Sequence, residues 1–214
     1  MMNKKTLLIL IIGIFGLFPF MVGCVNLELE KGYPEKRYFI LDASRDEDIS
    51  PPDTGITLSV RRFRISPQYE DKGFVYRLAD MSYDSDFYNE FFVSPASLLT
   101  EEIRKRLAGS GLFQLVVDPS SYMSPTYVLE GAVTALYGDH SMSTAPKAIL
   151  EMQFFLLQET AASPKIIFQN QYRKEEPLKE NTPDALVKSW NEALNQILTE
   201  FETDLKEYVS KTVP

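Results

Sequence analysis

The sequence contains few of the residues on which enzymes and metal proteins depend. Its 214 residues include one cysteine (Cys24), one histidine (His140) and one tryptophan (Trp190). A single cysteine cannot form an intramolecular disulfide, and one histidine with one cysteine cannot supply the ligand cluster of a zinc site. The chain also has no phosphate-binding loop, no dinucleotide-binding fingerprint and no nucleophile-elbow glycines around a serine. We therefore expect no metal site and no cofactor.

The histidine lies in a short segment, Tyr137 to Ser141, that has the composition of a turn between two strands. The sequence leaves open a Ser-His-Asp arrangement that includes His140. Nearly every general-base scheme in this chain would need this residue, yet no nucleophile motif accompanies it. The sequence therefore favours a protein without catalytic residues, and a periplasmic hydrolase is the distant alternative.

Positive charge is also scarce. The chain carries 22 Lys and Arg against 30 Asp and Glu. Residues 1–23 hold two of the cationic side chains and none of the anionic ones, so the rest of the chain carries 20 against 30, a net charge of −10. Nucleic acids and anionic lipid surfaces attract clustered positive charge. We therefore expect neither nucleic-acid binding nor direct adsorption on anionic lipid.

The N-terminus has the features of an export signal. Lys4 and Lys5 precede an uncharged apolar run from Leu7 to Phe20, and the small-residue tetrapeptide 21–24 follows it. Positive, apolar and cleavable segments in this order are typical of a secretory signal peptide. The run is shorter than the roughly 20 residues of a spanning helix, which makes a permanent transmembrane helix the less favoured alternative.

The cysteine ends a motif of its own. Residues 22–24 (Val-Gly-Cys) resemble the lipobox of bacterial lipoproteins, in which diacylglycerol is attached to the thiol and cleavage frees the cysteine amine for a further acyl chain such as palmitate. Met21 stands where leucine is commonest. Each buried methylene contributes about 0.8 kcal/mol, so two or three chains anchor a protein stably. By resemblance to the enterobacterial sorting rule, Val25, in place of aspartate, favours the outer membrane.

The sequence thus predicts a signal peptide over residues 1–23, a lipidated anchor and tether over 24–35, and a single domain over 36–214. Removal of 23 of the 214 residues leaves 191, a length that suits one hydrophobic core.

Two helices are predicted in this domain. Ser94-Pro95 is a start signal for a helix over Pro95 to Ala108, and Thr182-Pro183 is one for a helix over Asp184 to Val209. Apolar residues of the second helix recur at the helical period, which predicts a buried face: Leu186, Trp190, Leu194, Ile197, Phe201, Leu205 and Tyr208.

Alternation and β-branched or aromatic content predict seven strands: 36–42, 56–65, 74–79, 112–117, 127–137, 148–158 and 165–173. The second is expected to bulge at Arg61-Arg62, where two charged residues interrupt the alternation. The segment 159–164 has a length suited to a hairpin between the last two strands. These elements predict an α+β fold, a mainly antiparallel sheet with the two helices packed on one face.

The segment Tyr83 to Val93 is unusually dense in aromatic residues. One interpretation packs three side chains of this segment under the helix that begins at Pro95: Phe87, Phe91 and Val93. The other interpretation turns three side chains outward as an apolar partner-binding surface: Tyr83, Tyr88 and Phe92. Regular alternation along a strand would separate the first set from Tyr88 and Phe92.

Several short motifs follow the tether in order: Tyr38 to Leu41, Leu58 to Val60, Gly73 to Arg77, Phe87 to Asn89, Ser94-Pro95, Leu98 to Leu107, Gly111 to Phe113 and Tyr127 to Gly131. This order resembles the ABC-type transport auxiliary lipoprotein family, which includes lipoproteins of the paraquat-inducible protein C type. The resemblance covers about residues 36–210. Many relatives carry a tryptophan before the first helix, where this chain has Phe91-Phe92.

The resemblance implies a non-catalytic periplasmic subunit of an ABC transport system whose substrate-binding component is of the mammalian-cell-entry (Mce) type. Such systems move lipids or other apolar molecules between the inner and outer membranes, and another subunit hydrolyses ATP. The implied partners are the Mce-type protein and the permease and ATPase complex, with homo-oligomers left open. The alternative is a scaffold or assembly lipoprotein of outer-membrane biogenesis, a partner of a β-barrel or lipopolysaccharide-insertion machine.

Overall fold

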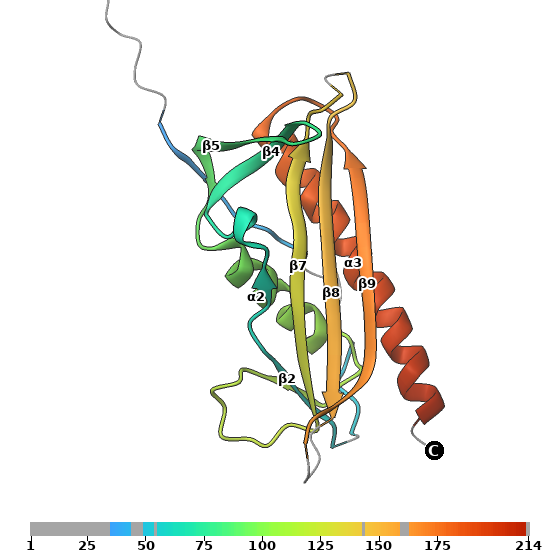
Figure 1. Ribbon diagram of the computed structural model, residues 1–214. Helices are drawn as coiled ribbons and strands as arrows, with labels where there is room; N and C mark the ends of the chain where they lie inside the picture. The colour runs from blue at the N-terminus through green and yellow to red at the C-terminus, as the bar shows by residue number, and fades with distance from the viewer. Residues whose placement is uncertain (1–34, 44–48, 54, 143, 159–162, 213–214) are drawn as a thin grey trace, which may run out of the picture. The chain divides into compact units, whose positions relative to one another are not determined.

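The computed structural model describes residues 35–43, 49–53, 55–142, 144–158 and 163–212, with side chains up to residue 208. The chain from Lys36 onward forms one compact unit. Its described part contains nine strands in one sheet, two α-helices and a 3-10 turn, η2 (Pro67–Tyr69) (Figure 1). The predicted signal peptide and Cys24 lie outside the described residues.

Three long strands form one side of the sheet: β7 (Tyr127–Asp139), β8 (Lys147–Gln158) and β9 (Lys165–Pro177) (Figure 1). Each runs antiparallel to the next. Alternate residues of β8 from Leu150 to Leu156 have no solvent exposure, as expected for strands with one covered face. In this part of the sheet the chain is an antiparallel meander, joined by the hairpin expected between the last two strands.

The rest of the sheet contradicts the predicted mainly antiparallel arrangement, because the sheet is mixed. β2 (Thr57–Val60), β3 (Arg64–Ile65) and β4 (Gly73–Ala79) follow one another along the edge of β7 that does not pair with β8, and all three run parallel to β7. The chain goes from β4 to β7 through a strand, a helix and another strand, which is the long connection that parallel pairing requires. Alternation marks a strand without revealing the direction of its neighbour, so the sequence pattern favours the simpler meander.

The outer strands add two more parallel pairs. β1 (Arg37–Phe39) runs parallel to β5 (Ser82–Phe91), and β6 (Leu115–Val117) runs parallel to β2. β4 and β5 pair antiparallel as a hairpin. The order β1-β5-β4-β7-β2-β6 makes β1 an edge strand of the described sheet.

The first helix, α2 (Pro95–Ala108), has the predicted bounds. The side chain of Ser94 accepts a hydrogen bond from the backbone N–H of Ser97 at 3.4 Å, and Pro95 occupies the first turn, where its missing N–H costs nothing. The apolar face of the helix has no solvent exposure: Leu99, Ile103 and Leu107.

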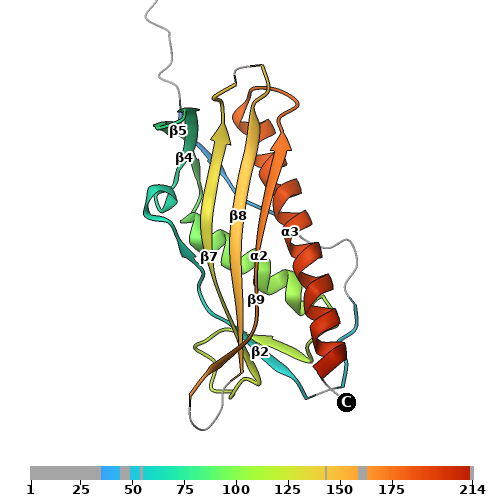
Figure 2. The same cartoon turned by 45° about the vertical axis from the view of Figure 1, so that its right-hand side comes forward.

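The second helix, α3 (Pro183–Thr212), lies along β8 and β9 on the same side of the sheet as α2 (Figures 1 and 2). Its Trp190 ring packs against Phe74 and Phe91, with centroid distances of 5.1 and 5.5 Å. Tyr208 is partly buried. The other six residues of the predicted apolar face have no exposure, which confirms that this face is core: Leu186, Trp190, Leu194, Ile197, Phe201 and Leu205.

The irregularity predicted in the second strand is present between β2 and β3. Val60 lies opposite Leu129, and Arg64 lies opposite Ala132. Arg64 is four residues after Val60, whereas Ala132 is three residues after Leu129. One extra residue is therefore inserted at the Arg61-Arg62 bulge.

Phe63 returns to the core after this bulge. Its ring occupies the space beside Gly131, where a Cβ atom would lie 2.1 Å from the ring. Glycine at this position is therefore required for the close approach of Phe63 to β7. The arginines on either side of Phe63 remain exposed: Arg61, Arg62 and Arg64.

Candidate functional site

The strand β5 contains a large bulge that decides where its aromatic side chains lie. Val75 of β4 lies opposite Ser85, whereas Gly73 lies opposite Glu90. A stretch of β5 that is five residues long is therefore paired with a stretch of β4 that is two residues long. Residues 86–89 lie opposite the single residue Phe74, so β5 carries three extra residues here, and this segment leaves the regular alternation of the strand.

Asp86 holds this bulge in shape. Its Oδ1 atom accepts hydrogen bonds from the backbone N–H groups of Tyr88 and Asn89, at 2.8 and 3.0 Å. A Cβ atom at Gly73 would lie 2.7 Å from Ser85 Oγ and 2.8 Å from the Asp86 carbonyl oxygen. Glycine at position 73 therefore allows β4 to approach the bulge closely.

The bulge partly contradicts the core interpretation of the aromatic segment. Phe91 is 2% exposed and packs against Phe74 at 4.8 Å, as the core interpretation predicted. Phe87 and Val93 were expected beside it but are 68% and 39% exposed. Because the bulge interrupts alternation, Phe87 and its neighbour Tyr88 both face solvent, with ring centroids 5.2 Å apart.

Strand β1 extends the exposed apolar surface of β5. The Tyr38 ring contacts the Phe92 ring edge-on at 6.1 Å, and Lys36 Nζ lies 4.5 Å from the centroid of Phe87. We define the aromatic patch as five side chains between 42% and 68% exposed: Tyr38, Ile40, Phe87, Tyr88 and Phe92.

The structure brings together only two of the three predicted partner-binding residues. All three side chains are exposed, as the outward-facing interpretation has them. Tyr88 and Phe92 belong to the aromatic patch, whereas the Tyr83 ring lies apart from it and contacts Tyr137 at 5.7 Å. Sequence reasoning missed Tyr38 and Ile40, although their alternation with buried residues in the first strand was a usable signal.

The residues around the histidine do not form a Ser-His-Asp relay in the described part of the chain. The Ser141 hydroxyl donates directly to Asp139 Oδ1 at 2.7 Å, and Asp139 also forms an ion pair with Arg77. The His140 ring packs edge-on against Tyr76 at 4.9 Å, and its buried Nε2 has no hydrogen-bond partner among these residues. Burial lowers the pKa of His140 against the opposing effect of the Asp139 charge, which favours a neutral imidazole.

The described residues provide neither a metal-binding cluster nor a membrane-spanning helix. Within the ranges given above, no three His, Cys, Asp or Glu side chains are grouped so that they could hold a metal ion. None of the helices in those ranges is long and apolar enough to cross a membrane.

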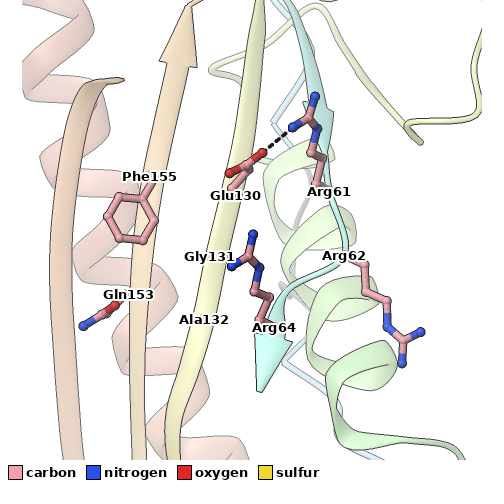
Figure 3. A pocket seen from close by; sticks show the side chains of 8 residues that line it. All are labelled: Arg61, Arg62, Arg64, Glu130, Gly131, Ala132, Gln153 and Phe155. Carbon is pink, nitrogen blue, oxygen red and sulfur yellow. Dashed lines mark hydrogen bonds and ion pairs between the residues drawn. The ribbon is translucent and has the colours of Figure 1, made fainter. Parts of the chain in front are cut away.

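A shallow pocket of about 440 Å³ lies on the face of the sheet opposite the helices (Figure 3). Arg61 forms an ion pair with Glu130 in this pocket. Arg62 donates instead to Ser94 Oγ at 3.1 Å, and Figure 3 shows its guanidinium pointing away from β7. We define the arginine pocket by six of its eight lining residues: Arg61, Arg64, Glu130, Ala132, Gln153 and Phe155.

Comparison with known proteins establishes the class of fold. No protein-family model matches the chain, and no curated protein matches its sequence. Protein XCC0632 from Xanthomonas campestris, described by the family model DUF330, superposes with a TM-score of 0.65 at 14% identity, over 77% of this chain and 94% of that one. A second solved structure, of an uncharacterised protein, gives a TM-score of 0.62 at 16% identity, over 80% and 99%. At these identities the similarity shows a shared fold.

Proposed function

We propose that the protein is a lipoprotein anchored to a bacterial membrane through Cys24, and that it serves an Mce-type ABC transport system as a non-catalytic auxiliary subunit. Two features of the sequence support this proposal: the lipobox-like motif that ends at Cys24 and the ordered family motifs from Tyr38 to Gly131. In this proposal the anchor lies on the periplasmic face, in the outer membrane, and ATP hydrolysis belongs to another subunit.

The aromatic patch is the observation that carries the proposal. Large exposed apolar patches on soluble domains mark interaction sites, and Tyr and Phe are enriched at the centres of protein interfaces. Tyr38, Phe87 and Phe92 are each more than half exposed, so they contribute little to the core of this domain. We infer that the patch contacts the Mce-type component.

The position of the patch suits a tethered docking subunit. Edge strand β1 begins at Arg37, 13 positions after Cys24, and a segment of that length spans at most about 45 Å when fully extended. The proposed anchor and proposed docking surface are thus adjacent in the chain, so the subunit would hold its partner within a short distance of the membrane.

The combined substitution of Tyr88→Ala and Phe92→Ala tests this function. Truncation of an interface anchor typically costs about 2 kcal/mol or more, so the double variant should lose most of the Mce-type protein that co-purifies with the tagged wild-type lipoprotein. Its thermal midpoint should stay close to that of wild type, because both rings are exposed. Tyr122→Ala, at a fully exposed ring in a loop, is the matched control and should co-purify normally.

Two results would contradict the proposal. One is a folded, membrane-localised double variant that retains the Mce-type protein as well as wild type does. The other is co-purification of wild type with a β-barrel or lipopolysaccharide-insertion protein and no Mce-type protein, which would support the scaffold alternative.

A further inference from the structure

The arginine pocket is positively charged, whereas the chain as a whole is acidic. Residues 24–214 have a net charge of −10, yet Arg61, Arg62 and Arg64 lie within four consecutive positions. Glu130 is the one carboxylate that lines the pocket. A local excess of positive charge on an acidic protein therefore needs a specific explanation.

The bulge between β2 and β3 creates this arrangement. It keeps Arg61 and Arg64 on the outer face of the sheet while Phe63 is 1% exposed in the core. Arg64 lies opposite Ala132 in the register of β3 with β7, and Figure 3 shows Arg61 and Arg64 on two sides of Glu130. The small Ala132 side chain leaves the floor of the pocket open.

The two guanidinium groups are only partly neutralised. The Arg61 guanidinium donates to Glu130, which shows that a carboxylate can occupy this position. For Arg64, the described residues provide no ion-pair partner. One carboxylate therefore faces two guanidinium groups, and an added anion would gain charge-assisted hydrogen bonds from both.

The pocket also provides space and an apolar wall for the rest of a ligand. Its volume of about 440 Å³ exceeds what a free phosphate ion would fill. A second hollow of about 260 Å³ shares Gln153 and Phe155 with it. Phe155 lies opposite Glu130 across β7 and β8, so its ring flanks the charged groups.

We propose that the arginine pocket binds the phosphate group of a phosphate ester, held by Arg61 and Arg64, with the organic part of the ligand against Phe155. Phosphate suits this pair better than carboxylate, because its additional oxygens can accept hydrogen bonds from two separate guanidinium forks. The ligand can be a lipid headgroup or a soluble phosphate ester. This inference does not rest on the proposed function, because it requires no transporter.

Titration calorimetry on the full-length protein, purified from membranes in one non-ionic detergent, tests the proposal with three probes. Glycerol 3-phosphate represents a soluble ester, dihexanoylphosphatidic acid a lipid with a phosphate headgroup, and dihexanoylglycerol the same lipid without phosphate. Wild type should bind at least one phosphate probe and should not bind dihexanoylglycerol. Equal affinity for both phosphate probes indicates a soluble ester, and affinity about tenfold higher for the phospholipid indicates a headgroup.

Four variants separate the pocket from general electrostatic attraction. Arg61→Gln with Arg64→Gln should weaken phosphate binding about tenfold or more, because it removes both guanidinium groups that donate charge-assisted hydrogen bonds to the phosphate. Ala132→Leu should abolish binding by filling the floor without a change in charge. Glu130→Gln should strengthen binding, because it removes the competing carboxylate. Lys165→Gln, which removes one exposed cation at the start of β9, is the control for lost positive charge outside the pocket and should bind as wild type.

The proposal is overturned if the double arginine variant binds the phosphate probes as well as wild type does. It is also overturned if wild type binds neither phosphate probe, or binds dihexanoylglycerol as tightly as the phospholipid. Circular dichroism of each variant checks that the protein is folded, so that a loss of binding is not caused by unfolding.

Discussion

Asp139 is a nearly buried carboxylate whose charge depends on its neighbours. Its side chain is 7% exposed and forms an ion pair with Arg77. Burial alone would raise the pKa of Asp139, but hydrogen bonds from Arg77 and Ser141 more than compensate and lower it to about 2. Because this value lies below the ordinary 3.8, the ionised carboxylate stabilises the fold above about pH 4, and this contribution is lost as the pH falls toward 2.

Substitution of Asp139→Asn should therefore lower the free energy of unfolding at pH 7 by about 2 kcal/mol. The difference from wild type should shrink as the pH falls from about 4 to about 2, where the wild-type carboxylate becomes protonated. Urea denaturation at several pH values measures this directly. Asp184→Asn breaks a pair in which both partners are about half exposed, so it should cost less than about 1 kcal/mol. A loss at Asp139 that does not change with pH would contradict the assignment.

The residue scale also shows which parts of the two candidate sites are predictable. Two adjacent arginines that interrupt an alternating strand mark the bulge at 61–62 in the sequence itself. The bulge at 86–89 depends on Asp86 binding backbone N–H groups and on the missing side chain of Gly73 in the neighbouring strand. Such contacts depend on how the strands pair, so the sequence gives no local signal for the exposure of Phe87.

At the scale of elements, α3 contributes the largest buried ring of the core. Trp190 has no solvent exposure, and its Nε1–H donates to the carbonyl oxygen of Ile149 at 3.3 Å. Trp190→Ala should cost about 3–5 kcal/mol, as expected for the loss of a large buried aromatic side chain. Chemical denaturation measures this cost. Glu192→Ala, on the exposed face of the same helix, should change stability by less than about 0.5 kcal/mol.

Fluorescence gives an independent measurement of the same packing. Because the chain has one tryptophan, emission excited at the long-wavelength edge, where tyrosine does not absorb, reports on Trp190 alone. It should be blue-shifted in the native state and should move to the red on unfolding. Native emission typical of a solvated indole would contradict the packing of α3 on the sheet.

The elements differ in how much of them the sequence determines. The start of α2 follows from Ser94 and Pro95, which act within one helical turn, and the hairpin of β8 and β9 follows from a short connection. The parallel pairing of β2, β3 and β4 with β7 joins segments on either side of α2. The residues of these strands do not indicate whether the pairing is parallel or antiparallel. For this reason the sequence predicted a mainly antiparallel sheet, whereas the sheet is mixed.

At the scale of the whole molecule, the proposed anchor accounts for the only cysteine of the chain. Cys24→Ser should abolish metabolic labelling with palmitate and should leave either uncleaved precursor or protein released from the membrane fraction. The reason is that the thiol is the site of the first acyl attachment in the lipobox scheme. Labelling, mobility on gels and membrane fractionation identical to wild type would show that the chain is held in another way.

The position of β7 in the sheet has a consequence for the order in which the protein folds. β7 pairs with β2, β3, β4 and β8, yet it begins at Tyr127, well after the three parallel strands that it joins. Non-local pairings slow folding because the loop must close before the contacts form. A chain that emerges from its N-terminus presents β2, β3 and β4 before their common neighbour exists. Each of these strands therefore keeps an unpaired edge until β7 has emerged, and the sheet closes late in synthesis.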